Sequence, residues 1–141
     1  MGFDAANARA QIYGSGRNQI SWISYLDVAR FAAASVENPA ARNCVIPLGG
    51  PDALSPLDVV RIFEEVGGRK FLVTHVPEEA LRAQRAAAAD SMQEAFASLM
   101  LYYAHGEVTD MKRALAIYPA QATNLASVRD YAQRLLRGAS A

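Results

Sequence analysis

The sequence contains a single cysteine, Cys44, so it cannot form an internal disulfide bond, and this fits a reducing compartment. Cys44 lies in a short apolar run, where we predict that it is a small core residue. The first residues, MGFDAANARA, lack the basic start and apolar stretch of a secretion signal. No segment approaches the roughly 18 uncharged apolar residues that a membrane helix needs. These absences predict a soluble, cytoplasmic protein.

The chain also lacks an excess of either charge. Its 14 Lys and Arg side chains balance 14 Asp and Glu side chains, and neither sign forms a long block. This balance argues against binding to nucleic acid or to an acidic membrane surface. The two histidines, His75 and His105, are far apart in the sequence and are accompanied by one cysteine, so we expect no metal site. His105 is placed where it can interact favourably with a helix C-terminus.

The one Gly-x-Gly, at Gly14 and Gly16, lacks the sequence of a dinucleotide-binding loop. That fingerprint needs a third glycine three residues later, with a strand before the loop and a helix after it. Here Gln19 takes the place of the third glycine, and the following QISWIS alternates like a strand. We therefore interpret the glycines as a turn or hairpin, and we predict that no residue of this chain binds a cofactor.

Catalytic signatures are missing as well. None of the six tyrosines has a lysine four residues later, so the Tyr-x-x-x-Lys pair, in which an ammonium lowers the pKa of a phenol, does not occur. The lysines are Lys70 and Lys112, and no Gly-x-Ser-x-Gly elbow is present. We therefore name no catalytic residue.

What the sequence does contain is enough apolar material for one domain, with 52% hydrophobic residues in a length of 141. Periodicity predicts strands at 20–25, 42–51 and 70–77, helices at 25–37 and 55–66, and further helices from 78 onwards. Alternating strands and helices favour parallel pairing. We predict an α/β fold: a small, partly parallel sheet of about three strands in residues 1–77, followed by a helical C-terminal part, 78–141, packed on it as one compact domain.

Three Ser-x-x-Asp capping boxes open helices at Ser24, Ser55 and Ser127. In such a box the serine oxygen accepts the amide of the third residue on, and the carboxylate reaches back to the serine amide. Asp27 and Arg30 could orient a substrate, but a capping carboxylate beside a surface arginine explains both without a function. We therefore predict that Asp27 is a cap.

The helix predicted after residue 90 carries an apolar stripe. Aromatic and thioether groups grip flat apolar ligands, and phenols add a hydrogen bond, so this stripe is the best candidate substrate pocket in the chain. The residues assigned to that pocket are Phe96, Met100, Tyr102 and Tyr103. The alternative is that the stripe belongs to the hydrophobic core, which helical spacing marks more often.

A family resemblance runs from about Gly14 to Lys70, through the stretch ISWISYLDVARFAAASVENPAARNCVIPLGGPDALSPLDVVRIFEEVGGRKF. A strand there leads into an Asp-Val-Ala-Arg helix, and an apolar strand that ends near Gly-Gly leads into a Ser-Pro-Leu helix. This order resembles the C-terminal half of NmrA-like, NAD(P)-binding atypical short-chain dehydrogenase/reductases. The closing SVRDYAQRLL resembles the last helix of that family.

The resemblance implies a division of labour within the complete family member. The nucleotide site lies in the amino-terminal half with its glycine-rich first loop, and the half seen here builds the far side of the sheet and the substrate pocket. By resemblance, the chain is a family fragment without the cofactor-binding core, and NAD(P) is implied only for a complete member.

Two functions follow as hypotheses. The chain is the substrate-side portion of an NAD(P)-dependent reductase or redox sensor that is competent only with its nucleotide half. Alternatively, it is a stand-alone small-molecule-binding or interaction module that hides the open edge of its small sheet by self-association. The expected partners are therefore a missing amino-terminal nucleotide-binding half or further copies of this chain, with a small-molecule ligand and no nucleic acid or membrane.

Overall fold

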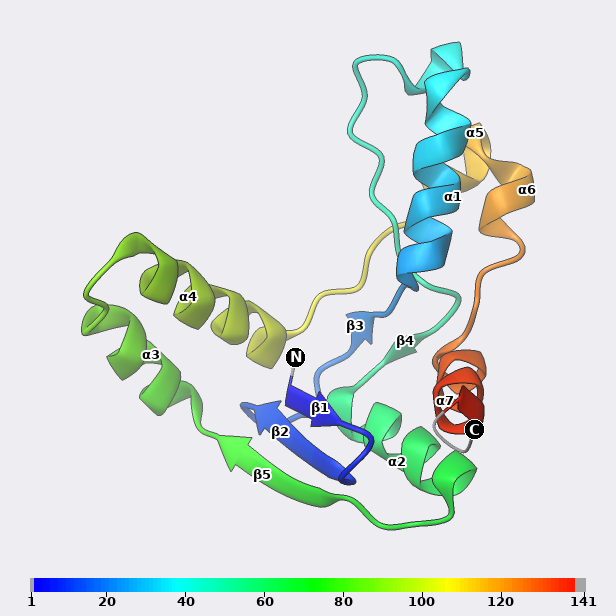
Figure 1. Cartoon of the computed structure of the whole chain (residues 1–141). Coiled ribbons are helices and arrows are strands. Elements are labelled where there is room, and N and C mark those ends of the chain that lie inside the picture. The colour runs from blue at the N-terminus through cyan, green and yellow to red at the C-terminus, as the bar shows by residue number, and fades with distance from the viewer. Residues whose placement is uncertain (1, 139–141) are drawn as a thin grey trace.

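The computed structural model describes residues 2–138 and has three groups of elements that meet at a short two-stranded sheet (Figure 1). One group holds the main sheet with α2 and α7, the second is the helical pair α3 and α4, and the third is α1 with α5 and α6. In chain order the elements are β1 (Gly2–Asp4), β2 (Arg9–Tyr13), β3 (Ile20–Ser21), α1 (Tyr25–Val36), η1 (Pro39–Ala41), β4 (Ala53–Leu54), α2 (Pro56–Gly67), β5 (Leu72–Val76), α3 (Glu78–Ala86), α4 (Ser91–His105), α5 (Lys112–Ile117), α6 (Pro119–Ala122) and α7 (Val128–Gly138).

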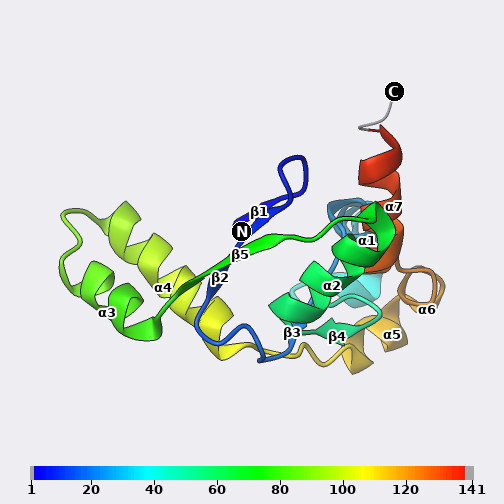
Figure 2. The same ribbon diagram turned by 90° about the horizontal axis from the view of Figure 1, so that it is seen from below.

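The main sheet has three strands in the order β1-β2-β5. The central strand β2 pairs antiparallel with β1 and parallel with β5, where Ile12 lies opposite His75. Ala10 and Ile12 of β2 are buried against Val60 of α2, while Gln11 between them is exposed. Helix α2 therefore covers one face of the sheet. The α3–α4 pair extends from the carboxyl ends of β2 and β5, where Tyr13 and Val76 pack on it (Figure 2).

The predicted fold class is confirmed, since the chain is α/β with a small sheet of mixed direction, but most of the strands are not those predicted. Of the predicted strands, 70–77 corresponds to β5. The strand predicted at 20–25 shrinks to β3, because Ser24 already caps α1. Strands β1 and β2 were missed, since GFD and RAQIY contain few β-branched residues and their pairing, rather than local propensity, makes them strands.

The strand predicted at 42–51 is wrong: the chain has no regular element between η1 and β4. The side chains of Cys44, Ile46 and Leu48 are half-buried, and those of Val45 and Pro47 between them are exposed. The alternation that predicted a strand is therefore present, but no described strand pairs with it. Cys44 is consequently half-buried at the surface and is not the core residue that the sequence predicted.

The capping boxes form as predicted at two of the three helices. Ser55 Oγ accepts the amide of Asp58 at 3.2 Å, and the Asp58 carboxylate accepts the amide of Ser55 at 3.0 Å. Ser127 and Asp130 exchange the same two bonds, at 3.1 and 2.9 Å. Helix α2 ends at Gly67 and is capped by Gly68, whose φ of 65° lies in the left-handed region that terminates helices.

Helices α2 and α7 enclose the largest part of the core. Val59 and Phe63 of α2 are buried against Ala132 of α7. Trp22 packs on this cluster, edge-on to Phe3 with ring centroids 6.1 Å apart. The core of this group therefore includes β1 and the residues beside β3 as well as the two helices.

The segment between α3 and α4 is a bend, so the two helices form a hairpin and lie side by side (Figures 1 and 2). Leu81 of α3 is buried against Met100 and Leu101 of α4. The cap of α4 is Asp90, whose carboxylate accepts the Gln93 amide at 2.8 Å.

In the third group, Phe31 of α1 is buried against α5 and Tyr118, and the two rings meet edge-to-face at 5.6 Å. Asp27 ties the start of α1 to the segment before α7, since its carboxylate accepts the amide of Ala126 at 2.9 Å. Within residues 2–138, no helix is both long enough and apolar enough to cross a bilayer.

We expect acid to destabilise the chain through its capping and bridging carboxylates. Hydrogen bonds from Ser55 and from Ser127 hold the pKa values of Asp58 and Asp130 below the usual 3.8, and Lys70 lowers the pKa of Glu64. Groups with a lowered pKa in the folded state stabilise the fold above their unfolded pKa, and this contribution disappears as the pH falls through the folded pKa. The melting temperature should therefore fall below about pH 4.

Circular dichroism melts between pH 2.5 and pH 7 would measure this fall. An Asp130→Asn variant should show a shallower dependence on pH, because one of the titrating groups is gone. A melting temperature that rises on acidification would contradict the assignment.

Candidate functional site

The carboxyl ends of the parallel strands β2 and β5 share one edge of the main sheet, because Tyr13 lies opposite Val76. In open sheets of this kind, ligands bind just beyond the strand ends. The chain leaves β5 directly into α3, and the last turn of α4 lies against the loop that follows β2. We call the polar residues gathered at this edge the strand-end cluster: His75, Glu78, Arg82, Tyr102, His105 and Glu107.

The loop after β2 is a turn held by its own chain. The Gly14 amide donates to the carbonyl of Val76 at 2.8 Å, and the Gly14 carbonyl lies 3.1 Å from Nδ1 of His75. Gly14 has a φ of 67°, and a Cβ there would lie 2.9 Å from Cβ of Ala104. The glycine is therefore required because the loop passes close to the end of α4.

The Gly-x-Gly loop does not fit a dinucleotide. A Cβ at Gly16 would lie 2.4 Å from the side chain of Ile12, and the Gly16 carbonyl accepts the amide of Leu57 at 3.2 Å. The next helix along the chain, α1, begins only after β3. Helix α2 contacts the loop through Leu57, but the carboxylate of Asp58 already caps its N-terminus. A pyrophosphate needs free amides at a helix N-terminus and glycines that open onto the ligand. The loop offers neither.

Glu78 is the centre of the strand-end cluster. Its Oε2 lies 3.0 Å from Nε2 of His105 and accepts a hydrogen bond from Arg82 at 3.1 Å. The hydrogen bond with His105 and the smaller effect of Arg82 lower the pKa of Glu78. The carboxylate is therefore ionised at neutral pH, where it joins the start of α3 to the end of α4 and is too weak a base for proton abstraction.

Tyr102 donates its phenol to Oε2 of Glu107 at 2.6 Å, and this bond raises the pKa of Tyr102. A tyrosine that transfers protons near neutral pH needs the opposite shift, which a nearby ammonium supplies. Lys70 and Lys112 each form an ion pair with a carboxylate instead. The strand-end cluster is therefore a set of exposed side chains that hydrogen-bond mainly to one another, and its geometry supports no proton transfer by Tyr102.

The four residues predicted for the substrate pocket all lie on α4 but point in different directions. Met100 is buried against Leu81 of α3. Phe96 and Tyr102 are exposed, and Tyr103 is half-buried with its ring 6.2 Å from that of Tyr102. Phe96 and Tyr102 therefore lie on the open surface of the helix, while Met100 belongs to the core.

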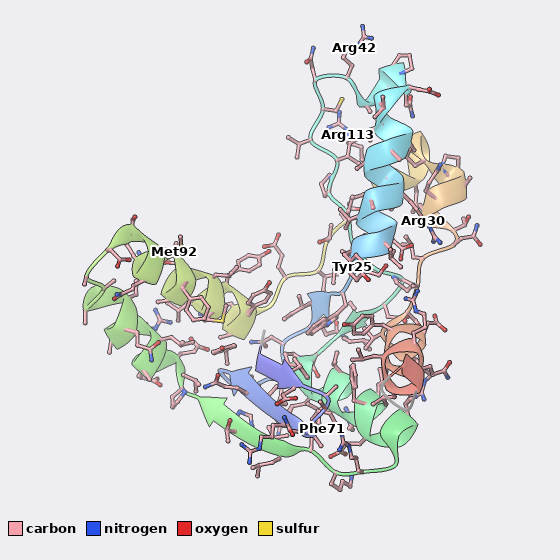
Figure 3. All side chains as sticks on the ribbon, viewed as in Figure 1. Tyr25, Arg30, Arg42, Phe71, Met92 and Arg113 are labelled. Atoms are coloured by element: carbon pink, nitrogen blue, oxygen red, sulfur yellow. The ribbon has the colours of Figure 1, made fainter. Side chains whose placement is uncertain are left out.

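Helix α4 is apolar on two sides. Its buried side packs on α3 and consists of Ala97, Met100, Leu101 and Ala104. Its opposite side, which we call the outer face of α4, consists of Met92, Phe96, Leu99 and Tyr102, each at least 45% exposed (Met92 is labelled in Figure 3). Helices that are apolar around most of their circumference are normally buried. The outer face of α4 is therefore a surface that a ligand or another protein segment could cover.

A hollow of about 510 Å³ lies between α1 and the segment 42–48. Four apolar residues at helical spacing on α1 line it: Phe31 is buried, but Val28, Ala32 and Val36 are exposed. Of these four apolar residues, only Phe31 therefore belongs to the core. We call this hollow the α1 groove, and Figure 3 shows Arg42 at its far end.

Sequence reasoning missed Glu78 and Arg82 as partners of His105, which it placed at a helix end without a neighbour. The shortness of the segment 87–90 between the two helices could have indicated this contact. A connection that short makes neighbouring helices antiparallel, so the start of α3 must lie beside the end of α4.

Neither a known protein-family model nor a curated protein matches the sequence. Solved structures match its fold. AtPrR2 in its apo form matches with a TM-score of 0.67 and 18% identity, over 90% of this chain and 44% of its own. The leucoanthocyanidin reductase of Vitis vinifera matches as a binary complex with NADPH, with a TM-score of 0.63 and 16% identity over 92% of this chain and 45% of its own.

The ternary complex of the same reductase matches with a TM-score of 0.63 and 14% identity, over 92% of this chain and 46% of its own. The chain therefore spans less than half the length of the solved structures that it matches. At these identities the likeness establishes the fold, which is part of a Rossmann-like α/β arrangement.

Proposed function

We propose that the chain is the substrate-side portion of an NmrA-like, NAD(P)-dependent reductase or redox sensor, and that it neither binds the nucleotide nor catalyses by itself. One observation carries the proposal. The matched region covers 90–92% of this chain but only 44–46% of each solved structure. One of these structures is a reductase in complex with NADPH.

Two uncovered surfaces support the proposal. The outer face of α4 and the α1 groove are both apolar, and both lie on helices whose other sides are already packed. Large apolar surfaces of this kind mark places where another protein part or a ligand binds. A nucleotide-binding half would cover both surfaces. Because the Gly-x-Gly loop of this chain does not fit a dinucleotide, that half would also have to bind the nucleotide.

The residues of α4 would then form a wall of the substrate pocket. Phe96 and Tyr102 present an aromatic surface, and Tyr103 lies beside Tyr102 at the end of the helix next to the strand-end cluster. Met100 supports this wall from the core side. In a complete reductase the nicotinamide supplies or takes the hydride, and these residues contribute position and shape.

A calorimetric titration with NADPH, and a second one with NADH, tests the proposal. We expect no saturable heat with either nucleotide, because the amides of Gly14 and Leu57 are engaged by carbonyls of the chain itself. A circular dichroism melt of the same sample establishes that the chain is folded. Saturable binding with one site per chain would refute the proposal.

A further inference from the structure

We propose that the segment Cys44–Leu48 is an edge strand that pairs antiparallel with the same segment of a second copy of this chain. The segment has the side-chain alternation of a strand, with its inward residues Ile46 and Leu48 packed on the cluster around Phe31. It runs alongside α1 in an extended path (Figure 1). This inference goes beyond the proposed function and does not depend on it.

The backbone of this segment has no partner in the described chain. None of the backbone hydrogen bonds among residues 2–138 involves residues 43–48, either as donor or as acceptor. An extended run of free amides and carbonyls beside a half-buried side-chain face is the template to which another strand adds. The binding partner of this segment is therefore another strand, which would pair with the backbone of residues 43–48.

Pro47 limits the pairing to one edge. In an extended segment the amides of successive residues point to opposite edges, so Val45 and Pro47 serve one edge and Cys44, Ile46 and Leu48 serve the other. Pro47 has no amide hydrogen, so its edge cannot complete a ladder. The intact edge accepts one strand, which gives a closed pair and no open stack of chains.

The composition of the segment suits a second copy. The residues 43–51 carry no charged side chain. The two guanidinium groups beside the segment, Arg42 before it and Arg113 on Cys44 Sγ, both lie at its Cys44 end, so an antiparallel pair places those of the two copies at opposite ends of the ladder. With Ile46 opposite its own copy, Cys44 lies opposite Leu48, and Val45 opposite Pro47 on the outer face. Val45 is 82% exposed in the single chain, and this pairing covers it with an apolar neighbour.

Sedimentation velocity and amide hydrogen exchange on the full chain test the proposal together. We expect a dimer at high concentration, with slow exchange at Cys44, Ile46 and Leu48 and fast exchange at Val45. Dilution to a monomer should make all four amides exchange rapidly, because the ladder bonds lie between the copies.

Two proline variants sharpen the test. Ile46→Pro removes a donor from the pairing edge and should raise the dissociation constant of the dimer about tenfold. Val45→Pro is the matched control on the other edge and should change the constant less than about twofold. A monomer at high concentration, or a dimer whose Val45 and Ile46 amides exchange equally fast, would overturn the proposal whether or not either variant folds.

Discussion

Asp27→Ala is expected to lower the free energy of unfolding by about 3 kcal/mol, because hydrogen bonds to a buried charged group each contribute about 1.5–3 kcal/mol. Asp27 is 2% exposed, and its carboxylate accepts the hydroxyl of Ser24, the amide of Ala126 and the guanidinium of Arg30, each at 2.9 Å. The alanine variant leaves the Ser24 hydroxyl and the Ala126 amide without this acceptor. Urea denaturation followed by circular dichroism measures the loss.

Arg30→Ala is the matched control for this prediction. Arg30 is 64% exposed in its ion pair with Asp27, and exposed ion pairs contribute about 1 kcal/mol or less. If both variants lose the same small amount, Asp27 does not join α1 to the segment before α7 in the way that the structure indicates.

Gly50→Ala should destabilise the chain by about 3 kcal/mol or more, since overpacking against rigid backbone is among the costlier core changes. A Cβ at Gly50 would lie 1.5 Å from the carbonyl oxygen of Trp22 and 2.6 Å from its carbonyl carbon. Ser21, beside Trp22, also donates its amide to the carbonyl of Glu107, so three distant segments meet here. The substitution therefore pushes apart the junction between the three groups of elements.

Gly68→Ala is the control, and we expect it to cost only about 1–2 kcal/mol. Its φ of 65° disfavours a side chain, but no atom lies within 4 Å of the added Cβ. Thermal melts of both variants compare the effects. Equal losses at Gly50 and Gly68 would show that backbone conformation, and not the contact with Trp22, decides the cost at Gly50.

The helices could be predicted from the sequence because their signals are local. Ser55 and Asp58 are read within one capping box, and the structure confirms both of them. The strands could not be predicted equally well, because strand pairing is a long-range property. Ile12 becomes central only when His75 lies beside it, and the run around Ile46 remains unpaired although its pattern is that of a strand.

In the candidate site, too, local patterns could be predicted from the sequence and long-range contacts could not. The stripe on α4 was visible in the sequence, but which of its residues face inward depends on α3, so Met100 is buried and Phe96 is exposed. The capping prediction for Asp27 was incomplete for a similar reason. Ser24 caps α1 as expected, but the carboxylate of Asp27 binds the amide of Ala126, which lies far along the chain and could not be anticipated from the box alone.

The claim on which this account depends is that the one Gly-x-Gly loop serves the chain's own packing and has no affinity for a nucleotide. A titration of the isotopically labelled chain with NADPH, read at the amide resonances of Gly14, Gly16 and Leu57, tests it most directly. We expect these resonances to stay in place at millimolar NADPH, because the Gly14 and Leu57 amides donate to Val76 and Gly16. Saturable shifts confined to these three amides would contradict the account.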